Sequence, residues 1–284
     1  MSLKNRIVRA LNRHVLPRHR LVLRKSGHEA ENGLLTPSLR ERMFADIAAI
    51  AGPWLESVLG SEMAMPASAL PGAVADFAEL HERRPVRDNS GGMGFNGSLW
   101  LYLFARALRP DLIVECGTWQ GHSAWLMAEA APEAQLITFD IEHDNLLVRH
   151  PRADYRLGDW GSHMVVARAR SLIFFDDHIS HARRLREAAD RGFRHCLFDD
   201  DVPTNGVFLT GDPPLPTLAM LHDPQMRPGM RIDWRYRERE FHYVASEDDW
   251  ASAALIEAYR PVPPLRPASP YREHLGLAYV RLRG

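Results

Sequence analysis

Two groups of side chains in this sequence have the types and spacing that chemistry needs. The first is a corner in 112-LIVECGTWQGHSAWLM-127, where an apolar run leads into Glu115 and then into Gly117 and Gly121. A glycine directly after a strand lets the backbone turn sharply and lets a ligand approach closely, because no Cβ intervenes. The free N–H groups of the helix that follows favour an anion or a carboxylate. The corner therefore predicts a ligand-binding turn between a strand and a helix.

The second group is a set of acidic residues that ends two apolar runs, 174-FFDDH-178 and 198-FDDDV-202. Carboxylates that converge on one cleft repel one another and raise one another's pKa, and a divalent cation removes that penalty. Ligation by oxygen atoms alone suits magnesium. The alternative is that these acids are solvated or cap helices. A magnesium site at these strand ends is thus a hypothesis that the sequence supports.

The elements that must position both groups alternate from Asp111 onward. The expected strands are 112–116, 135–140, 154–159, 171–177 and 193–201, and the expected helices between them are 122–131, 143–150 and 180–192. Strands separated by helices form βαβ units and a parallel sheet. The acids and glycines fall at the carboxyl ends of the strands, where open α/β sheets bind ligands. The predicted fold class is α/β, with a mostly parallel, Rossmann-like sheet and helices on both faces.

Two domains are expected along the chain. Residues 1–95 are predicted to form a helical N-terminal extension, because 37–60 and 73–84 carry apolar residues three and four positions apart. Residues 96–284 would form the sheet domain, ending in strands near 260–263 and 275–283. Within it, 203–245 is rich in proline and charge and is predicted to be an irregular insertion that serves as a lid or binding loop, the alternative being a plain surface loop.

Composition and charge narrow the partners. The chain has 35 basic and 36 acidic residues, so its bulk charge gives no reason to expect nucleic acid. Basic and apolar residues interleave over residues 1–25, before the first acid at Glu29. This pattern is typical of a basic amphipathic helix that lies on an anionic membrane, on a partner or on the protein's own domain. Cys116 and Cys196 are the two cysteines, which argues for a reducing compartment and predicts a cytoplasmic, or membrane-peripheral, protein.

The glycine corner extends into a longer pattern. Glu115-x-Gly117-x-x-x-Gly121-x-Ser123, followed by Asp140 at the end of the next strand, resembles the class I S-adenosylmethionine-dependent methyltransferases. Within that class it is most similar to the catechol and macrocin O-methyltransferase groups. The glycine spacing differs from G-x-G-x-x-G, which disfavours a nicotinamide oxidoreductase.

The resemblance implies contacts to S-adenosylmethionine. Glu115, Gly117 and Ser123 would line its methionine end, Asp140 would accept hydrogen bonds from the ribose hydroxyls, and Asp159 would border the adenine. The implied cofactor-binding residues are Glu115, Gly117, Thr118, Gly121, Ser123, Asp140, Ile141, Asp159 and Trp160. The alternative for the two aspartates is that they cap helices.

The resemblance also implies a metal site and exposes a missing base. In the catechol-type group an Asp-His pair ends the fourth strand and Asp-Asn the fifth. The magnesium ligands implied here are Asp177, Asp200 and Asp201. The group's lysine would fall at Ser180, and a serine cannot do its work as a base. His178 and His181 are the nearest substitutes, because imidazoles exchange protons near neutrality, and His178 is the predicted catalytic residue.

Two functions follow as predictions. The first is an S-adenosylmethionine-dependent O-methyltransferase that acts on a hydroxyl of a small or glycosidic acceptor. A metal would assist it by lowering the pKa of a hydroxyl that is held in line with the methyl group. The alternative is a non-catalytic cofactor-binding or partner-docking protein that kept the fold and lost the base. Ser180 favours the alternative, and the crowd of acids favours the enzyme.

Overall fold

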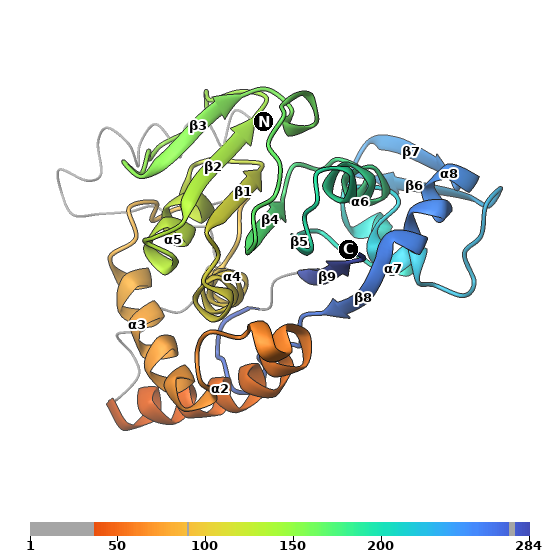
Figure 1. Cartoon of the computed structure of the whole chain (residues 1–284). Helices are drawn as coiled ribbons and strands as arrows, with labels where there is room; N and C mark the ends of the chain where they lie inside the picture. Colours follow the sequence, from red (N-terminus) through yellow and green to blue (C-terminus); the bar gives the residue numbers. More distant parts are fainter. Residues whose placement is uncertain (1–36, 90, 273–275) are drawn as a thin grey trace, which may run out of the picture. The chain divides into compact units, whose positions relative to one another are not determined.

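The computed structural model describes residues 37–89, 91–272 and 276–284 (Figure 1). These residues all belong to one compact unit. The predicted basic segment at residues 1–25 lies outside the described residues.

The core of the described residues is a seven-stranded sheet with the order β3-β2-β1-β4-β5-β9-β8. Its strands are β1 (Leu112–Cys116), β2 (Gln135–Asp140), β3 (Ala153–Leu157), β4 (Ser171–Phe175), β5 (His195–Phe198), β8 (Ile256–Pro261) and β9 (Ala278–Leu282). The first five strands run parallel, while β9 pairs antiparallel with both β5 and β8. This arrangement confirms the predicted mostly parallel, Rossmann-like sheet.

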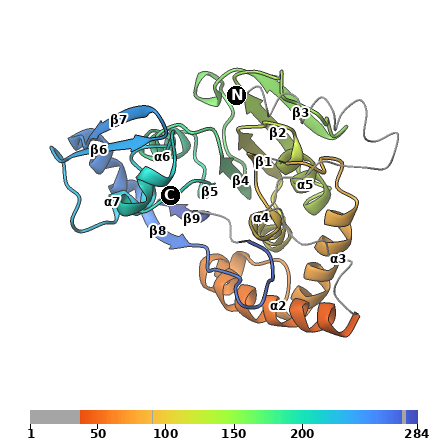
Figure 2. The same cartoon turned by 180° about the vertical axis from the view of Figure 1, so that it is seen from behind.

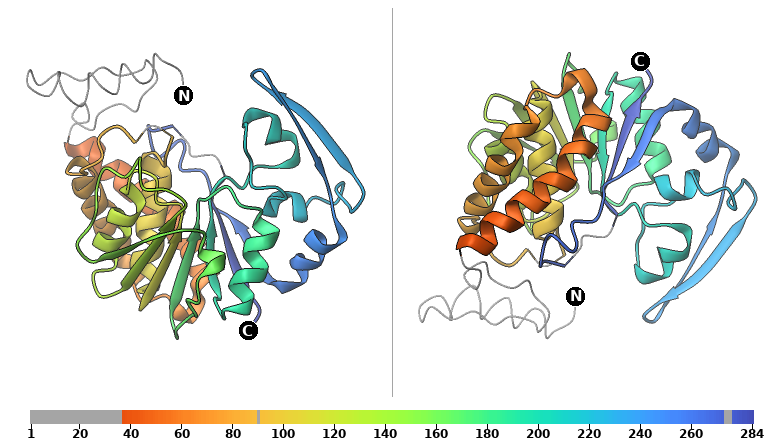
Figure 3. Two further views of the ribbon diagram at one scale, coloured as in Figure 1. Left: turned by 90° about the horizontal axis from the view of Figure 1, so that it is seen from above. Right: turned by 90° about the horizontal axis from the view of Figure 1, so that it is seen from below.

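Helices cover both faces of this sheet (Figure 2, Figure 3). One layer contains α2 (Pro37–Leu59), α3 (Leu70–Glu82), α4 (Phe95–Leu108) and α5 (His122–Ala130). The other contains α6 (His181–Asp190), α7 (Leu218–Leu221) and α8 (Glu247–Ala251). Side chains alternate between the two layers along each strand: in β4, Leu172 and Phe174 pack into the first layer, and Ile173 and Phe175 into the second.

The helices before the sheet share its core. Leu55 of α2 and Phe77 of α3 are fully buried in the same apolar cluster as Phe174 of the sheet. By length and composition alone the stretch Pro37–Glu62 could cross a membrane, but 44% of its 18-residue apolar window is buried inside this fold. The described part of the predicted extension is therefore helical, and it completes one layer of the sheet domain.

β4 pairs with β1 on one side and with β5 on the other. Cys116 on β1 and Cys196 on β5 therefore lie on strands that are not neighbours, and both are free, buried thiols. No disulfide joins them.

Two expected elements differ in the structure. Residues 143–150 form no helix; instead Leu147 and Val148 each donate a backbone hydrogen bond to the carbonyl of Gln120 (3.2 and 3.3 Å), which ties this loop to the glycine corner. The expected irregular insertion 203–245 contains regular structure, including the hairpin of β6 (Arg231–Tyr236) and β7 (Arg239–Val244). Its apolar side chains pack with α7 in a small core of their own. Short 3-10 turns lie at 60–62, 67–69, 160–162, 204–209 and 252–255.

Candidate active site

The glycine corner is shaped by close backbone contacts. Gly117 has φ +100°, and a Cβ there would lie 2.1 Å from the carbonyl oxygen of Asp176. Gly121 has φ +85°, and a Cβ there would lie 2.2 Å from the carbonyl oxygen of Val148. Both positions therefore need glycine for two reasons, a left-handed backbone and a neighbouring chain in contact. The first contact brings the end of β1 directly against the end of β4.

Asp140, at the carboxyl end of β2, holds the turn that follows β1. Its Oδ2 accepts hydrogen bonds from the N–H groups of Thr118 (2.9 Å) and Trp119 (2.8 Å). Its Oδ1 accepts a longer one from the N–H of Glu142 (3.3 Å), so this oxygen keeps capacity to accept from a ligand hydroxyl. Ile141 follows with 78% of its surface exposed, which offers an apolar surface beside the carboxylate.

Glu115 is a fully buried carboxyl at the same corner. The hydroxyl of Thr138 donates to its Oε2, while Oε1 has no partner with hydrogen-bond geometry among the described residues. Burial, with a smaller effect of the Asp140 charge, raises the pKa of Glu115 to about 7, against the opposing effect of the Ser123 and Thr138 hydroxyls. Buried polar atoms normally have a partner. The orphaned Oε1 therefore suits a ligand that brings a hydrogen-bond donor to this corner.

Asp159 and Trp160 are used by the protein itself. The Asp159 carboxylate accepts from Arg183 (2.5 Å), Arg184 (2.7 Å) and the N–H of Gly161 (2.9 Å). Partial burial opposes these partners, but they lower its pKa to about 2. Trp160 is 0% exposed and packs in the second layer of the core, so the structure does not place it where a ligand would meet it.

Two of the three expected magnesium ligands are also engaged elsewhere. Asp177 forms an ion pair with Arg184 of α6. Asp201 is 6% exposed and accepts from the hydroxyl of Tyr259 (2.6 Å) and the N–H of Ala219 (2.7 Å). Burial raises the pKa of Asp201 to about 6. The structure therefore does not bring Asp177 and Asp201 together with Asp200.

A different set of side chains gathers around Asp200. Asp176, His178 and Asp200 each offer one ligand atom, and these atoms lie within 4.8 Å of one another. Burial, followed by the charges of Asp199 and Asp200, raises the pKa of Asp176 well above its usual range. His178 (φ +56°) and Asp200 (φ +55°) both have a left-handed backbone, which is uncommon outside glycine and concentrates at functional sites. The donor set, two carboxylates and an imidazole, fits a divalent cation.

The two histidines after β4 differ in their freedom to take a proton. His178 is half exposed, and its Nδ1 lies 3.0 Å from the carbonyl oxygen of Asp212 and 3.3 Å from Oδ2 of Asp200. When Nδ1 carries the hydrogen and donates, the lone pair of Nε2 is available. His181 is buried, with Nδ1 accepting from the N–H of Leu218 (3.2 Å) and Nε2 donating to the carbonyl of Asp199 (3.1 Å). Burial lowers its pKa to about 3, so His181 is structural.

Ser180, at the place of the expected lysine, is the N-cap of α6. Its hydroxyl accepts from the N–H of Arg183 (3.3 Å), the bond that a serine cap makes. It therefore supplies the start of a helix rather than a base.

The chain resembles several solved methyltransferase structures at low sequence identity. No family model and no curated protein matches the chain. Among solved structures, it resembles the methyltransferase PaMTH1 of Podospora anserina bound to S-adenosylhomocysteine (14% identity, 75% of this chain, 88% of that chain, TM-score 0.42). It also resembles the O-methyltransferase TomG of Streptomyces achromogenes in complex with S-adenosylmethionine (13%, 82%, 95%, 0.43) and an O-methyltransferase of Bacillus cereus (11%, 81%, 96%, 0.42). At these identities and scores, the activity has to be argued from this chain's own residues.

Proposed function

We propose that the chain is an S-adenosylmethionine-dependent O-methyltransferase that acts on a hydroxyl of a small or glycosidic acceptor with the help of a divalent cation. The observation that carries the proposal is the convergence at one edge of the sheet. There the Asp140-anchored glycine turn meets the end of β4, which leads into the acids around Asp200. A cofactor site and an acidic site thus share one edge, where open α/β sheets bind their ligands.

The residues at the corner fit the cofactor by their chemistry. Glu115 has an unpartnered buried oxygen that suits the ammonium of a methionine moiety. Asp140 keeps an oxygen for ribose hydroxyls, and Ile141 offers an exposed apolar surface for a purine ring. The same turn and helix start contain the other expected residues, Gly117, Thr118, Gly121 and Ser123.

The chemistry follows from charge and proton placement. When bound, S-adenosylmethionine supplies an electrophilic methyl group, and a cation favours the deprotonated form of the acceptor oxygen. Asp176 and Asp200 would hold the cation, and its remaining positions would be filled by water and the acceptor. Nδ1 of His178 donates to the carbonyl of Asp212, which leaves Nε2 to take the proton that the hydroxyl releases. The oxygen loses that proton and gains the methyl group, and the sulfonium becomes a thioether.

His178 can serve only one of two roles at that nitrogen. Its Nε2 has one lone pair, so it can bind a cation or a proton, but not both at once. The proposal gives His178 the proton and assigns the cation to the two carboxylates. Removing the imidazole should therefore affect turnover far more than metal affinity.

Two measurements test the proposed function. Calorimetry should detect binding of S-adenosylhomocysteine but not of NAD. Radiolabelled S-adenosylmethionine should methylate at least one member of a panel of catechols and glycosides, and a chelator should abolish transfer while leaving cofactor binding intact. Cofactor binding with no transfer to any acceptor would favour the non-catalytic alternative. Absence of S-adenosylhomocysteine binding would overturn the proposal.

The location of the protein is part of the proposal. The cysteine content supports a cytoplasmic protein, and the charge pattern of residues 1–25 supports peripheral contact with an anionic membrane.

A further inference from the structure

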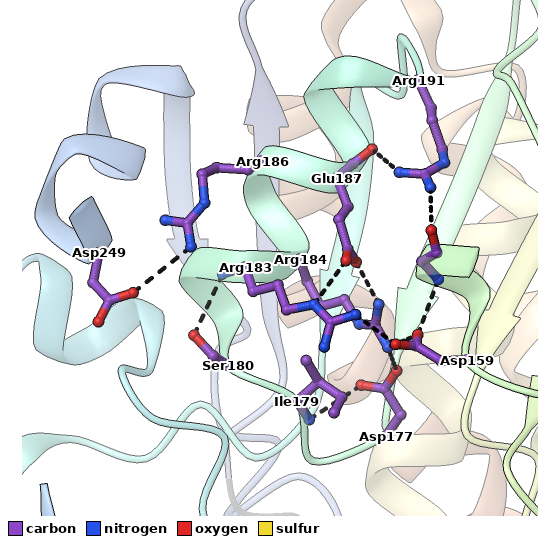
Figure 4. Close-up of polar contacts among 11 residues, drawn as sticks. Asp159, Asp177, Ile179, Ser180, Arg183, Arg184, Arg186, Glu187, Arg191 and Asp249 are labelled. Carbon is purple, nitrogen blue, oxygen red and sulfur yellow. Dashed lines mark hydrogen bonds and ion pairs between the residues drawn. The ribbon is translucent and has the colours of Figure 1, made fainter. Parts of the chain in front are cut away.

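A buried cation lies behind the candidate metal site. Arg184 of α6 is 1% exposed, and its guanidinium forms ion pairs with Asp159 (2.7 Å), Asp177 and Glu187 (Figure 4). The ring centroid of Trp160 lies 5.9 Å from the guanidinium carbon of Arg184. Arginine is almost never buried to this degree unless it is paired, because desolvation of the charge is costly. The cluster therefore contains three carboxylates and one buried guanidinium, and removing that positive charge alone would be strongly destabilising.

The guanidinium fixes the direction of the loop after β4. Nη2 of Arg184 donates to Oδ2 of Asp177, while the N–H of Ile179 donates to Oδ1 (3.3 Å). Both oxygens of Asp177 are thus satisfied by the protein. Asp177 is thus anchored to α6, while its two sequence neighbours, Asp176 and His178, each have a ligand atom within 4.8 Å of one of Asp200.

The shape of the arginine side chain explains why this position needs it. Nη2 reaches Asp159 and Asp177 together, while Nη1 reaches Glu187. The ammonium of a lysine is a single point charge and cannot span three carboxylates in this way. A fork that joins the segment after β3 to the loop after β4 holds both in one arrangement.

We infer that Arg184 is a positioning residue for the metal site: it holds Asp177 away from the cation and so presents Asp176 to the cation, with His178 beside it. This inference rests on the metal site of the proposed function. It assigns Asp177, one of two neighbouring acids, to an internal ion pair, and Asp176 to the ligand set.

Arg183 provides a matched control. It precedes Arg184 on α6 and pairs with two of the same three acids, Asp159 (2.5 Å) and Glu187 (2.8 Å). Its side chain is 44% exposed, and its ion pairs among the described residues do not include Asp177. A variant at Arg183 therefore alters the ion pairs of the same helix with Asp159 and Glu187 without releasing the loop after β4.

The experiment measures Mn²⁺ affinity of the full chain by electron paramagnetic resonance, a readout that needs no turnover. Asp176→Asn should weaken binding by about a hundredfold, because a ligand is lost, whereas Asp177→Asn should weaken it by less than about tenfold. Arg184→Lys should weaken it by about tenfold or more, and Arg183→Lys by less than about twofold. Circular dichroism and the thermal midpoint check that each variant is folded.

A second variant keeps the test decisive if Arg184→Lys fails to fold. The double variant Asp177→Asn/Arg184→Met removes the cation together with its partner Asp177, and Arg183 still pairs with the other two acids, Asp159 and Glu187. It should fold and still bind Mn²⁺ about tenfold more weakly than the wild type, because the loop has lost its anchor.

The outcomes separate this inference from the proposed function. Wild-type affinity in Arg184→Lys or in the folded double variant would overturn the inference alone. The same holds if Asp177→Asn abolishes binding and Asp176→Asn does not, since Asp177 would then be the ligand. Absence of Mn²⁺ binding by the wild type would overturn both the inference and the metal-assisted part of the proposed function.

Discussion

Replacing Asp140 with alanine should both loosen the glycine corner and weaken cofactor binding. The variant removes the acceptor of two amide hydrogen bonds, from Thr118 (2.9 Å) and Trp119 (2.8 Å). Thr118 is 1% exposed, so water does not readily replace the lost partner. A hydrogen bond to a charged group contributes about 1.5–3 kcal/mol, and the partial exposure of Asp140 favours the lower end for each bond. We therefore expect a loss of about 3 kcal/mol in the free energy of unfolding.

This loss converts into a measurable shift. For a domain of this size, 1 kcal/mol lowers the thermal midpoint by about 2–4 °C, so Asp140→Ala should lower it by about 6–12 °C. The same variant removes the carboxylate proposed for the ribose, and the dissociation constant for S-adenosylhomocysteine should rise at least about tenfold, or 1.4 kcal/mol. Differential scanning calorimetry measures the first effect and titration calorimetry the second.

Two further variants make the result interpretable. Asp140→Asn keeps an acceptor oxygen for the two N–H groups, so its midpoint should fall between the wild type and Asp140→Ala. Asp144→Ala removes an exposed acid from the loop that follows and should behave as the wild type. An unchanged midpoint in Asp140→Ala would refute the anchoring of the turn. A lowered midpoint with unchanged cofactor affinity would refute the ribose contact alone.

Other predictions concern buried titration, catalysis and the start of the chain. The folded pKa of Glu115 is about 7 against an ordinary 4.5, so the free energy of unfolding of the wild type falls as the pH rises from 4.5 through 7. Glu115→Gln should remove this dependence, so its stability relative to the wild type should be up to about 3 kcal/mol greater at pH 8 than at pH 5. Urea unfolding measures both proteins at both pH values. If the free energy of unfolding of Glu115→Gln differed from that of the wild type by the same amount at pH 5 and at pH 8, the prediction would be contradicted. The folded pKa of His122 is about 4 against an ordinary 6.5, so its contribution to stability is lost as the pH falls below 6.5, by up to about 1.4 kcal/mol per pH unit. The free energy of unfolding of His122→Gln should therefore fall less steeply than that of the wild type as the pH is lowered. An unchanged acid slope would rule this out. His178→Ala should reduce methyl transfer by about a hundredfold with Mn²⁺ affinity nearly unchanged, whereas loss of Mn²⁺ binding would make His178 a ligand instead. Liposome co-sedimentation through residues 1–25 should require acidic lipid and fade in high salt; no sedimentation at low salt would leave a helix packed on the protein.

The sequence predicts the corner well because its signals are local. An apolar run followed by Gly117 and Gly121 specifies a strand and a turn, and both glycines have the left-handed backbone that the turn requires. The alternation after Asp111 likewise predicts each central strand to within a few residues, since burial on both faces demands continuous apolar runs.

The sequence does not reveal which acid of a pair faces the cleft. Asp176 and Asp177 are chemically identical, and their directions depend on Arg184, seven positions after Asp177. In the sequence that arginine belongs to a run of charged residues typical of a solvated helix face, and its burial follows only from the packing of α6. Trp160 is a similar case, because its place beside Asp159 suggests a ligand surface while its indole fills the core.

The helix expected at 143–150 does not form, again because of a contact with a residue outside the segment. Its residues have helical spacing, but Leu147 and Val148 donate their backbone hydrogen bonds to Gln120 of the glycine corner. A tertiary hydrogen bond thus replaced the local one, and no pattern within the segment reports this.

The position of β9 has a consequence for the order in which the protein folds. β9 lies inside the sheet, between β5 and β8, yet it comes long after β5 in the sequence. During synthesis β5 therefore waits as an open edge, with unpaired backbone groups and the apolar stretch 195-HCLF-198, until residues 278–282 have emerged. Open apolar edges are where nascent chains associate with one another. The yield of folded protein during synthesis should thus depend on how soon β9 is made after β5. Substitutions that weaken β9 should cause newly made chains to aggregate before they reduce the activity of each folded molecule.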